Sequence, residues 1–475
     1  MTRTYIKDTA GSVGKEVLIK GWVNVRRDHG KLIFLDIRDV TGIVQAVINP
    51  KVAPDAHKTA ESLRNEFVVE IKGKVNERPK NLINPNLPTG TVEVETSSIV
   101  ILNSAKDLPF QLDDTRKVNE ETRLKYRYLD LRSERMAKNI WLRYKVTQLV
   151  REYLGKNGFI EIETPLLTKT SPEGARDFLV PSRLQPGKFY ALPQAPQQYK
   201  QLLMIAGFER YFQIAKALRD EDLRGDRQLE HTQIDMEMSF ATEQDVLDMV
   251  EGLMIFVAES CGKKILQKPF PVYTHEQAMK EFGADKFDLR VPSSSLPYQE
   301  GERGGSDTLA FAWVTDFPLF EKDEDTKKFT FAHNPFSAPK AEYVEKLMKE
   351  EDLGNLRAQQ FDLVCNGVEL ASGGVRISDP KVQRKVFEIM GLSPDETEER
   401  FGHLIRAYEY GAPPHAGMAP GLDRLVMILA GEDNIREVIP FPVTSSGQTS
   451  VMDAPSEADP KQLKELHIKI DLPKK

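Results

Sequence analysis

The chain contains the segment FQIAKALRDEDLRGDRQLEHTQIDMEM (Phe212–Met238), in which two strand-like halves flank a strongly charged centre. The first half is rich in apolar residues and Thr232–Met238 alternates, so the segment predicts two strands joined by a loop. Arg219, Arg224 and Arg227 lie in that loop. Their planar guanidinium groups suit forked hydrogen bonds to phosphate. On this segment alone, a solvated hairpin with weak salt bridges is an open alternative.

A pair of carboxylates follows further along the chain, in DLVCNGVE (Asp362–Glu369). Apolar residues alternate across a turn, which places both acids near one strand end. Such oxygen ligands suit Mg²⁺ that bridges substrate phosphates, although exposed acids on an ordinary strand would give the same pattern. In the next segment, ASGGVR (Ala371–Arg376), small residues let a ligand approach the backbone and Arg376 can bind an anion.

A third segment, PPHAGMAPGLDRLVMIL (Pro413–Leu429), combines a glycine-rich loop with an apolar helix. Arg424 lies one turn inside the start of that helix, and a helix N-terminus with an arginine makes an anion site. Leu425–Leu429 alone would be ordinary core. The sequence lacks GxxxxGK[ST], a GxGxxG after a strand and HExxH, so it does not resemble three common phosphate and zinc motifs.

The region before the central segment predicts a long helix and a linker. Apolar residues at helical spacing indicate an amphipathic helix over Met136–Asn157, which Gly158 ends. Phe159–Glu163 alternates as a strand. The charged residues 104–135 suit a hinge, and residues 136–475 mix strands and helices as in an α+β enzyme domain. Within it, Pro292–Asp307 is rich in Ser, Gly and Pro, as in an exposed linker.

The first hundred residues predict a small β-domain. Turn signals separate five strand-like segments, and the helical stretch Pro54–Asn65 lies between the third and the fourth. This order is typical of an OB-fold β-barrel over residues 1–103, although strand count alone would also fit another small β-domain. The five segments are Glu16–Val25, Leu32–Ile37, Ile43–Ile48, Phe67–Val75 and Thr91–Ile101.

The composition and charge of the chain exclude several classes of protein. The 475 residues are 40% hydrophobic and 29% charged, which excludes a mainly disordered chain. No run approaches a membrane span, and Met1–Lys20 lacks the apolar centre of a signal peptide. The two cysteines, Cys261 and Cys365, are far apart, which argues against a disulfide framework. We therefore expect a cytoplasmic protein without a membrane partner. Its net charge of −7 argues against indiscriminate nucleic-acid binding but leaves room for a local basic face.

In their order and spacing, these segments resemble the signature motifs of class II aminoacyl-tRNA synthetases. GFIEIETPLL (Gly158–Leu167) resembles the first motif, Arg219-Asp-Glu221 with its loop the second, and Gly421-Leu-Asp-Arg424 the third. A preceding OB barrel is typical of the aspartyl, asparaginyl and lysyl subgroup. The match is strongest to the bacterial-type aspartyl-tRNA synthetases and covers nearly the whole chain. It includes LKYRYLDLR (Leu124–Arg132), SPEGARDFLVPSR (Ser171–Arg183) and NIREVIPFP (Asn434–Pro442).

The resemblance implies an architecture and partners. The expected fold is α+β, with the OB-fold anticodon-binding barrel (1–103), the hinge (104–135) and a class II catalytic domain (136–475) whose antiparallel sheet is flanked by helices. The first motif implies a homodimer. The implied substrates are L-aspartate, ATP with Mg²⁺, and tRNA(Asp).

The resemblance also implies residues for the aspartate site. Lys200 would pair with the side-chain carboxylate of aspartate, Arg376 would supply a second cation, and His333 would lie on a mobile loop that closes over the substrate. The implied aspartate-binding residues are Glu173, Gln197, Lys200, Arg219, Gln233, Asp235, His333 and Arg376.

For ATP, the resemblance implies that Arg424 holds the γ-phosphate and that Asp362 and Glu369 carry Mg²⁺. Arg219, Glu221 and Arg424 are the implied catalytic residues. Adenylation brings a carboxylate onto the α-phosphorus, which needs cations rather than a protein nucleophile. The implied ATP-binding residues are Arg219, Asp220, Glu221, Gln228, His231, Glu369, Gly421, Leu422, Asp423 and Arg424.

In the barrel, Arg27, Phe34, Gln45 and Glu93 match family positions that read the anticodon. Phe34 can stack on a splayed base, although a barrel-core aromatic is the alternative. His29 matches a loop position associated with enzymes that also aspartylate tRNA(Asn). The hypothesis that follows is a non-discriminating enzyme, and a surface histidine without consequence is the alternative.

The sequence departs from the family in two ways. First, the extra bacterial domain between the second and third motifs is expected to be lost, which leaves a shortened region at about 271–310. Second, His231 replaces a common phenylalanine, and Ala195, Asn334 and Pro420 replace other common residues. These changes bear on substrate affinity rather than on the reaction.

Three other functions compete with the aspartyl enzyme. Lys200 and Arg376 suit a carboxylate, and a neutral amide would leave both charges unpaired, which argues against an asparaginyl enzyme. An amide ligase that uses aspartyl-adenylate would not need the barrel. A non-catalytic RNA-binding paralogue would be expected to lack Arg219, Glu369 or Arg424, and all three are present.

Overall fold

The computed structural model describes residues 2–170, 174–290, 307–323 and 328–472. The chain forms two units, residues 1–111 and residues 112–475, each with its own internal contacts. The predicted linker Pro292–Asp307 lies, except for Asp307, outside the described residues.

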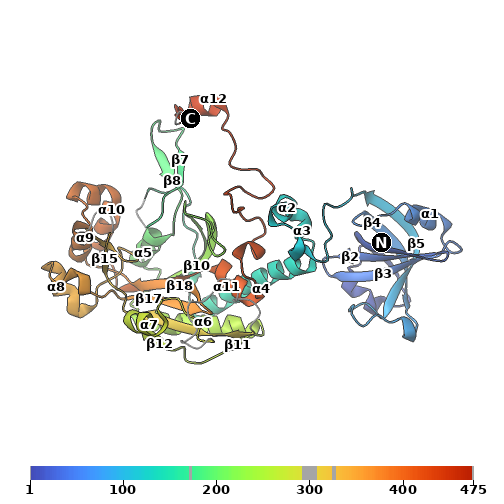
Figure 1. Cartoon of the computed structure of the whole chain (residues 1–475), viewed down its shortest axis with the longest axis horizontal. Helices are drawn as coiled ribbons and strands as arrows, with labels where there is room; N and C mark the ends of the chain where they lie inside the picture. Colours follow the sequence, from blue (N-terminus) through green and yellow to red (C-terminus); the bar gives the residue numbers. More distant parts are fainter. Residues whose placement is uncertain (1, 171–173, 291–306, 324–327, 473–475) are drawn as a thin grey trace. The chain divides into compact units, whose positions relative to one another are not determined.

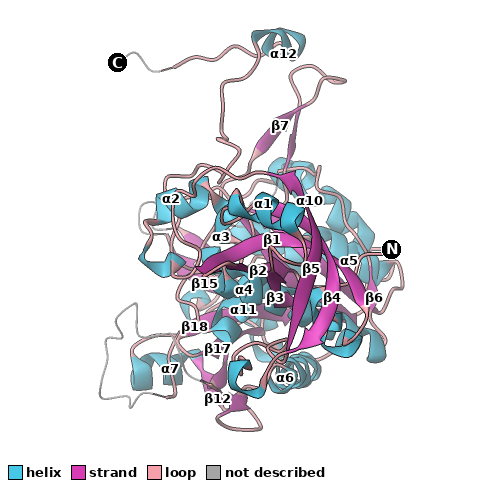
Figure 2. Cartoon of the chain, turned by 90° about the vertical axis from the view of Figure 1, so that its right-hand side faces the viewer, coloured by secondary structure: helices cyan, strands magenta, loops and turns pink. Residues whose placement is uncertain are grey.

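The first unit is a closed five-stranded barrel with the order β1-β2-β3-β5-β4 (Figure 2). Alternate residues of β2, such as Ile33 and Leu35, are buried in the core, while Phe34 between them is only half-buried. The helix α1 (Pro54–Glu61) lies between β3 and β4 in sequence, which confirms the predicted OB-fold. The strands are β1 (Glu16–His29), β2 (Leu32–Asp39), β3 (Gly42–Ile48), β4 (Val68–Glu77) and β5 (Val92–Asn103).

The hairpin between β1 and β2 is longer than the sequence predicts. The predicted first strand ends at Val25, but β1 continues through His29, which pairs with Leu32. Gly30 makes the turn with a φ of 62°, a conformation that glycine adopts without strain. His29 is therefore exposed at the tip of this hairpin.

The second unit is built on an eight-stranded sheet with the order β12-β14-β17-β18-β19-β10-β9-β6 (Figure 1). Its inner pairs are antiparallel, and only the outermost strand at each edge pairs in parallel. The strands are β6 (Ile160–Glu161), β9 (Arg210–Leu218), β10 (Glu230–Ser239), β12 (Val272–Thr274), β14 (Phe311–Thr315), β17 (Gln360–Cys365), β18 (Val368–Val375) and β19 (His415–Pro420). The predicted antiparallel sheet flanked by helices is confirmed.

Three helices pack against this sheet through one large apolar core: α4 (Glu134–Lys156), α6 (Glu243–Ser260) and α11 (Leu422–Ala430). The amphipathic prediction for α4 holds because Val146, Val150 and Leu154 at helical spacing are all fully buried. Its start is capped by the side chain of Ser133, and Gly158 follows its end with a φ of 80°.

The other helices and short strands surround the central sheet. The helices are α2 (Glu120–Lys125), α3 (Arg127–Asp130), α5 (Gln197–Ile205), α7 (His275–Phe282), α8 (Val344–Met348), α9 (Pro380–Ile389), α10 (Pro394–Tyr408) and α12 (Pro460–Glu465). The short strands are β7 (Leu179–Pro181), β8 (Phe189–Ala191), β11 (Lys264–Ile265), β13 (Thr308–Leu309), β15 (Phe320–Lys322) and β16 (Phe329–Phe331).

The segment predicted as a hinge divides between the two units. Residues 104–111 fall in the first unit and residues 112–135 in the second. There Arg127 is fully buried, and its guanidinium donates to the backbone oxygens of Ile439 and Pro440 at 2.8 and 2.9 Å. Arg123 pairs with Glu437 at 2.8 Å. These contacts tie α2 and α3 to residues 437–440 of the same unit. The boundaries of the three predicted regions, 1–103, 104–135 and 136–475, remain predictions.

Candidate active site

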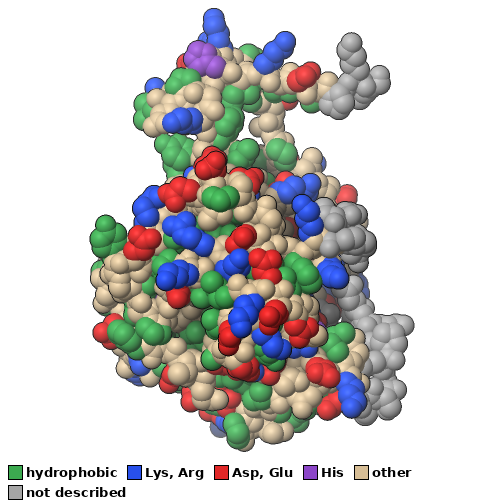
Figure 3. Space-filling view, turned by 90° about the vertical axis from the view of Figure 1, so that its left-hand side faces the viewer, with side chains coloured by type: hydrophobic (Ala, Val, Ile, Leu, Met, Phe, Trp, Pro, Cys, Tyr) green, Lys and Arg blue, Asp and Glu red, His purple; other side chains and the backbone are tan. Residues whose placement is uncertain are grey.

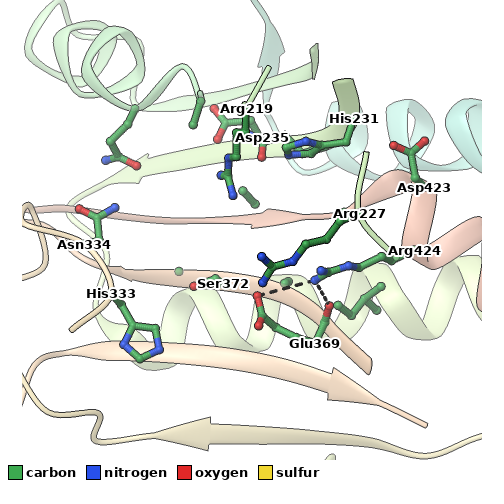
Figure 4. A pocket seen from close by; sticks show the side chains of 18 of the residues that line it. Arg219, Arg227, His231, Asp235, His333, Asn334, Glu369, Ser372, Asp423 and Arg424 are labelled. Carbon is green, nitrogen blue, oxygen red and sulfur yellow. Dashed lines mark hydrogen bonds and ion pairs between the residues drawn. The ribbon is translucent and has the colours of Figure 1, made fainter. Parts of the chain in front are cut away.

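A cavity of about 440 Å³ opens where β10, β18 and β19 meet the β9–β10 loop, the start of α5 and the start of α11 (Figure 4). Most of the residues that the motifs single out line it, although they come from segments that lie far apart in the chain. The predicted residues in its lining are Gln197, Lys200, Arg219, Glu221, Gln228, His231, Gln233, Asp235, His333, Glu369, Arg376, Gly421, Asp423 and Arg424.

A buried network of two cations and two anions forms one end of the cavity. The Lys200 ammonium lies 2.7 Å from Oδ1 of Asp235 and 3.2 Å from Oε2 of Glu237. Nε of Arg376 donates to Oε1 of Glu237 at 2.8 Å, and its Nη2 donates to Oε2 at 3.2 Å. All four side chains are almost completely buried, so the protein holds these charges in place instead of water.

The electrostatics of this network follow from burial and pairing. Burial raises the pKa of Asp235 above its ordinary value, and Lys200 offsets this only in part. Burial would also raise the pKa of Glu237, but Arg376 and Lys200 outweigh it and hold that pKa below the usual range. Glu237 is therefore the permanent counter-ion of both cations.

Two buried polar atoms in this end of the cavity have no partner among the described residues. They are Oδ2 of Asp235 and Nε2 of Gln233, which belong to the same strand, β10. A buried polar group without a partner costs free energy, so such atoms mark a place for a polar ligand. One is an acceptor and the other a donor, which together fit an ammonium beside an oxygen-bearing group.

The fold needs glycine beside this network. Gly417 of β19 is paired with Glu237 of β10, and its carbonyl oxygen accepts from Nη2 of Arg376 at 3.2 Å. A Cβ added at Gly417 would lie 2.1 Å from Oε2 of Glu237 and 2.2 Å from the backbone oxygen of Met236. The side chain of Glu237 thus occupies the space that any other residue at position 417 would need.

Three arginines, from the β9–β10 loop and the start of α11, line the other end of the cavity. Arg227 and Arg424 extend toward Glu369 (Figure 4), and Nη1 of Arg424 donates to the backbone oxygen of Glu369 at 2.7 Å. Arg424 also lies 3.3 Å from Asp226 of the β9–β10 loop, and Arg227 lies 3.2 Å from Glu221. Arg219 donates to the backbone oxygen of Gln194 at 3.3 Å. Fixed guanidinium groups at one end of a pocket suit a polyphosphate.

His231 lies on β10 and lines the cavity. Burial, together with the charges of Arg219 and Arg424, lowers the pKa of His231 to about 3. The imidazole is therefore neutral near pH 7, and a neutral ring can stack on a nucleobase as the expected phenylalanine would.

Three predicted residues are placed differently, and a fourth, Glu173, lies outside the described residues. Leu422 is buried in the apolar core, and Asp220 lies outside the cavity lining with its carboxylate 3.7 Å from Arg176. Asp423 lines the cavity, but Arg143 at 2.5 Å and the backbone nitrogen of Thr232 at 2.7 Å engage its two oxygens. Asp423 thus ties α11 to α4 and β10.

Asp362 and Glu369 lie on the neighbouring strands β17 and β18. Asp362 is buried beneath the cavity lining, opposite Ser372, and burial together with the Glu369 carboxylate raises its pKa well above the ordinary value. Two carboxylates that repel each other in this way would be relieved by a cation, so the pair fits Mg²⁺. Among the described residues there is no cluster of three or more metal-ligating side chains. A magnesium ion that is bound mainly by substrate phosphates needs no such cluster.

The predicted anticodon residues form a row on the outer face of the barrel. Arg27 makes a forked ion pair with Asp36, at 2.7 and 2.8 Å, and Gln45 donates to Glu93 at 3.1 Å. Phe34 pairs with Arg27 across β1 and β2 and belongs to the same outer face. Phe34 is therefore not a core aromatic, because its neighbours Ile33 and Leu35 point inward instead.

Two residues that these networks need were not predicted from the sequence. Glu237 neutralises both cations of the buried network, and Asp36 holds Arg27. The only sequence signal for Glu237 is its place two residues after Asp235 on an alternating strand, which puts both acids on one face. Asp36 carries the same kind of signal, since it lies two residues after Phe34.

Comparisons with known proteins agree with this geometry. Residues 119–445 match the family model described as tRNA synthetases class II (D, K and N), and residues 17–102 match the OB-fold nucleic acid binding domain. The chain belongs to the class II tRNA synthetases of this group, which are ligases that use ATP. A solved asparaginyl-tRNA synthetase from Pyrococcus horikoshii covers 93% of this chain and 98% of its own, with a TM-score of 0.74 and 22% identity, and this likeness shows the fold alone.

Two curated relatives indicate which enzymes of this class the chain belongs with. A protein of Rubrobacter xylanophilus named aspartate–tRNA(Asp/Asn) ligase is 43% identical over 99% of this chain and 98% of its own length. A protein of Macrococcus caseolyticus named aspartate–tRNA ligase is 40% identical over 98% and 97%. Within the class, the chain belongs with these aspartate–tRNA ligases. The first alignment runs over 591 positions and this chain has 475 residues, so at least 116 aligned positions have no residue here.

Proposed function

We propose that the enzyme activates L-aspartate with ATP and transfers the aspartyl group to the 3′ end of tRNA(Asp). The observation that carries this proposal is the charge balance at the buried end of the cavity. Lys200 and Arg376 lie at that end with Asp235 and Glu237, and Arg219, from the other end of the cavity, adds one further positive charge to the wall that would face the substrate. Aspartate, with one net negative charge, neutralises the remaining positive charge, whereas asparagine and lysine do not.

The free polar atoms give the substrate an orientation. Oδ2 of Asp235 would accept from the ammonium of aspartate, and Nε2 of Gln233 would donate to one of its oxygens. The side-chain carboxylate would then lie by Lys200 and Arg376, with Gln197 beside it. The reacting carboxylate would point toward Arg219 and the arginine-rich end of the cavity.

At that end, ATP would bind with its phosphates among the guanidinium groups and its base on His231. Arg219 would neutralise the charge that builds up as the carboxylate attacks the α-phosphorus, and Arg424 would hold the γ-phosphate. Asp362 and Glu369 would hold Mg²⁺, which adds positive charge at the phosphates. Each of these residues binds, orients or neutralises, and none acts as a nucleophile.

ATP–pyrophosphate exchange without tRNA tests this function. We expect exchange with aspartate and none with asparagine or lysine. Exchange with asparagine at a comparable kcat/KM would contradict the charge argument. If that argument is wrong, the variant Lys200→Met should also exchange as fast as the wild type in the same assay. A control variant such as Lys216→Met changes an exposed lysine on the neighbouring strand and should leave exchange unchanged.

We also propose that the enzyme accepts tRNA(Asn). Two observations favour this wider range: His29 is exposed at the tip of the β1–β2 hairpin, and the Rubrobacter relative carries both tRNAs in its name. Aspartylation of the two purified tRNAs decides the matter. If the rate of aspartylation of tRNA(Asn) is no higher than that of an unrelated tRNA, the enzyme does not accept tRNA(Asn).

A homodimer is proposed from the edge of the sheet. The strand β6 lies at that edge, and Ile160 within it is exposed, as are Trp141 and Tyr144 on α4. Large apolar side chains that gather on an open sheet edge and a neighbouring helix are typical of a subunit interface.

No helix of the described residues is long and apolar enough to cross a membrane. We also propose that the enzyme is located in the cytoplasm.

A further inference from the structure

A second cavity of about 240 Å³ adjoins the active-site cavity. Its walls come from residues 168–170, from Pro193 and Ala195, and from the helices α5 and α10. Ala195 lines both cavities, so a ligand in one lies directly beside a ligand in the other. None of the residues to which the aspartate and ATP roles are assigned above lines this second cavity.

The second cavity has a one-sided charge. Lys169 and Arg400 are cationic, and none of the described residues in the lining is acidic. This is unusual for a chain with a net charge of −7. His403 is neutral near pH 7, because burial and the charge of Lys169 lower its pKa. The face of the second unit that carries α8, α9 and α10 shows acidic and basic side chains interspersed (Figure 3). On α10 itself, Glu398 pairs with Arg406, which does not line the cavity.

Several polar side chains of this cavity are held in place by hydrogen bonds. Lys169 donates to the backbone oxygen of Glu399, and Nε2 of His403 contacts Oε1 of Gln198 at 2.7 Å. The hydroxyl of Thr168 donates to that of Tyr199 at 3.4 Å. Together with Arg400, the walls therefore present cations, amide groups and hydroxyls, which is the chemistry that binds a phosphate group.

Basic side chains are also found along the β7–β8 hairpin, together with exposed aromatic rings. Its strand β8 joins the rim of the cavity through the paired backbone hydrogen bonds of Thr168 and Ala191, at 2.9 and 3.0 Å. Residues 178–194 contain Arg183 and Lys188 but no acidic residue, and the aromatic rings of Phe189 and Tyr190 are exposed. Cations interleaved with exposed aromatic rings suit a single nucleic-acid strand.

We propose that the second cavity binds a backbone phosphate of the single-stranded 3′ end of the tRNA. This inference rests on the proposed function, because the terminal ribose must reach the aspartyl-adenylate in the first cavity. A strand that ends there and passes Ala195 places a preceding phosphate in the second cavity. Lys169 and Arg400 then neutralise that phosphate together.

The test compares aminoacylation by the wild type with that by Lys169→Ala and Arg400→Ala. Each loss of a charge-assisted contact should raise the KM for tRNA about tenfold. Each should also flatten the dependence of log KM on log salt by about 0.7, as expected for one lost contact to a single strand. Arg406→Ala is the matched control, since it removes a positive charge from the same helix outside the cavity. It should leave both quantities unchanged.

Two further measurements distinguish this phosphate site from a pyrophosphate site and from a general effect on RNA affinity. ATP–pyrophosphate exchange, including the KM for pyrophosphate, should be unchanged in both variants, and a raised KM would assign the cavity to pyrophosphate instead. A tRNA that lacks its single-stranded 3′ nucleotides should inhibit the wild type and the variants with the same inhibition constant.

An equal loss of affinity for the truncated RNA would overturn the proposal, as would an unchanged KM for intact tRNA. Failure of the wild type to exchange with aspartate would count against the proposed function. The binding of intact and truncated RNA, measured directly, would then still test the cavity.

Discussion

Replacement of Glu237 by glutamine should destabilise the second unit strongly. Glu237 is fully buried and accepts two hydrogen bonds from Arg376, at 2.8 and 3.2 Å, while its carboxylate lies 3.2 Å from the Lys200 ammonium. Glutamine keeps the shape but removes the charge, so two buried cations would share Asp235 alone. Breaking a buried ion pair from one side costs about 3–5 kcal/mol. We expect the free energy of unfolding to fall by this amount.

Urea unfolding followed by tryptophan fluorescence measures the effect, because Trp313 is buried in the core of the second unit. The matched control is Glu230→Gln, at the exposed start of the same strand, where the pair with Lys216 lies on the surface. It should cost less than about 1 kcal/mol. A loss below about 1 kcal/mol for Glu237→Gln would refute the reasoning, since it would mean that water or Asp235 compensates both cations.

Three further predictions concern other parts of the molecule. Phe34→Ala should raise the KM for tRNA about 5- to 100-fold by loss of base stacking, with ATP–pyrophosphate exchange unchanged; an equal loss of exchange would contradict it. His231→Phe should keep the KM for ATP within about fivefold, since a ring with a pKa of about 3 is already neutral, and a pH-dependent KM between pH 6 and 8 would argue otherwise. Although burial opposes it, Arg123 and Arg135 lower the pKa of Glu437 from 4.5 to about 2. Glu437→Gln should therefore cost about 3 kcal/mol of unfolding free energy at pH 7. Acid titration of stability checks this, because the difference from the wild type should shrink as the pH falls from about 4.5 to 2.

Local sequence patterns predicted the elements and many of the cationic groups. The barrel strands follow from alternation, and α4 from its apolar spacing between Ser133 and Gly158. Arg219 and Arg424 could be singled out because they sit beside turn and helix-start signals that are visible in a few residues. The family resemblance then supplied Lys200, which no local pattern marks.

Other parts of the site depend on contacts that only the folded sheet creates. Glu237 becomes a counter-ion because β10 brings it beside β19 and α5, and nothing near it in sequence shows that Arg376 is its partner. Asp423 was grouped with Arg424 because they are adjacent, yet successive side chains of a helix point about 100° apart, and the carboxylate of Asp423 reaches Arg143 instead. Sequence adjacency predicts the segment that forms a site better than the direction of each side chain.

The close approach of Glu237 to Gly417 limits how this gene can change. Every codon that encodes glycine is one base from codons for larger residues, and each of those would place atoms where the Glu237 carboxylate lies. Such a mutation would displace the counter-ion of Lys200 and Arg376 from the buried network. Position 417 contributes no side chain, yet we expect it to tolerate substitution as poorly as the arginines that are proposed to bind ATP. A mutational scan that records only loss of activity would therefore wrongly group Gly417 with those arginines.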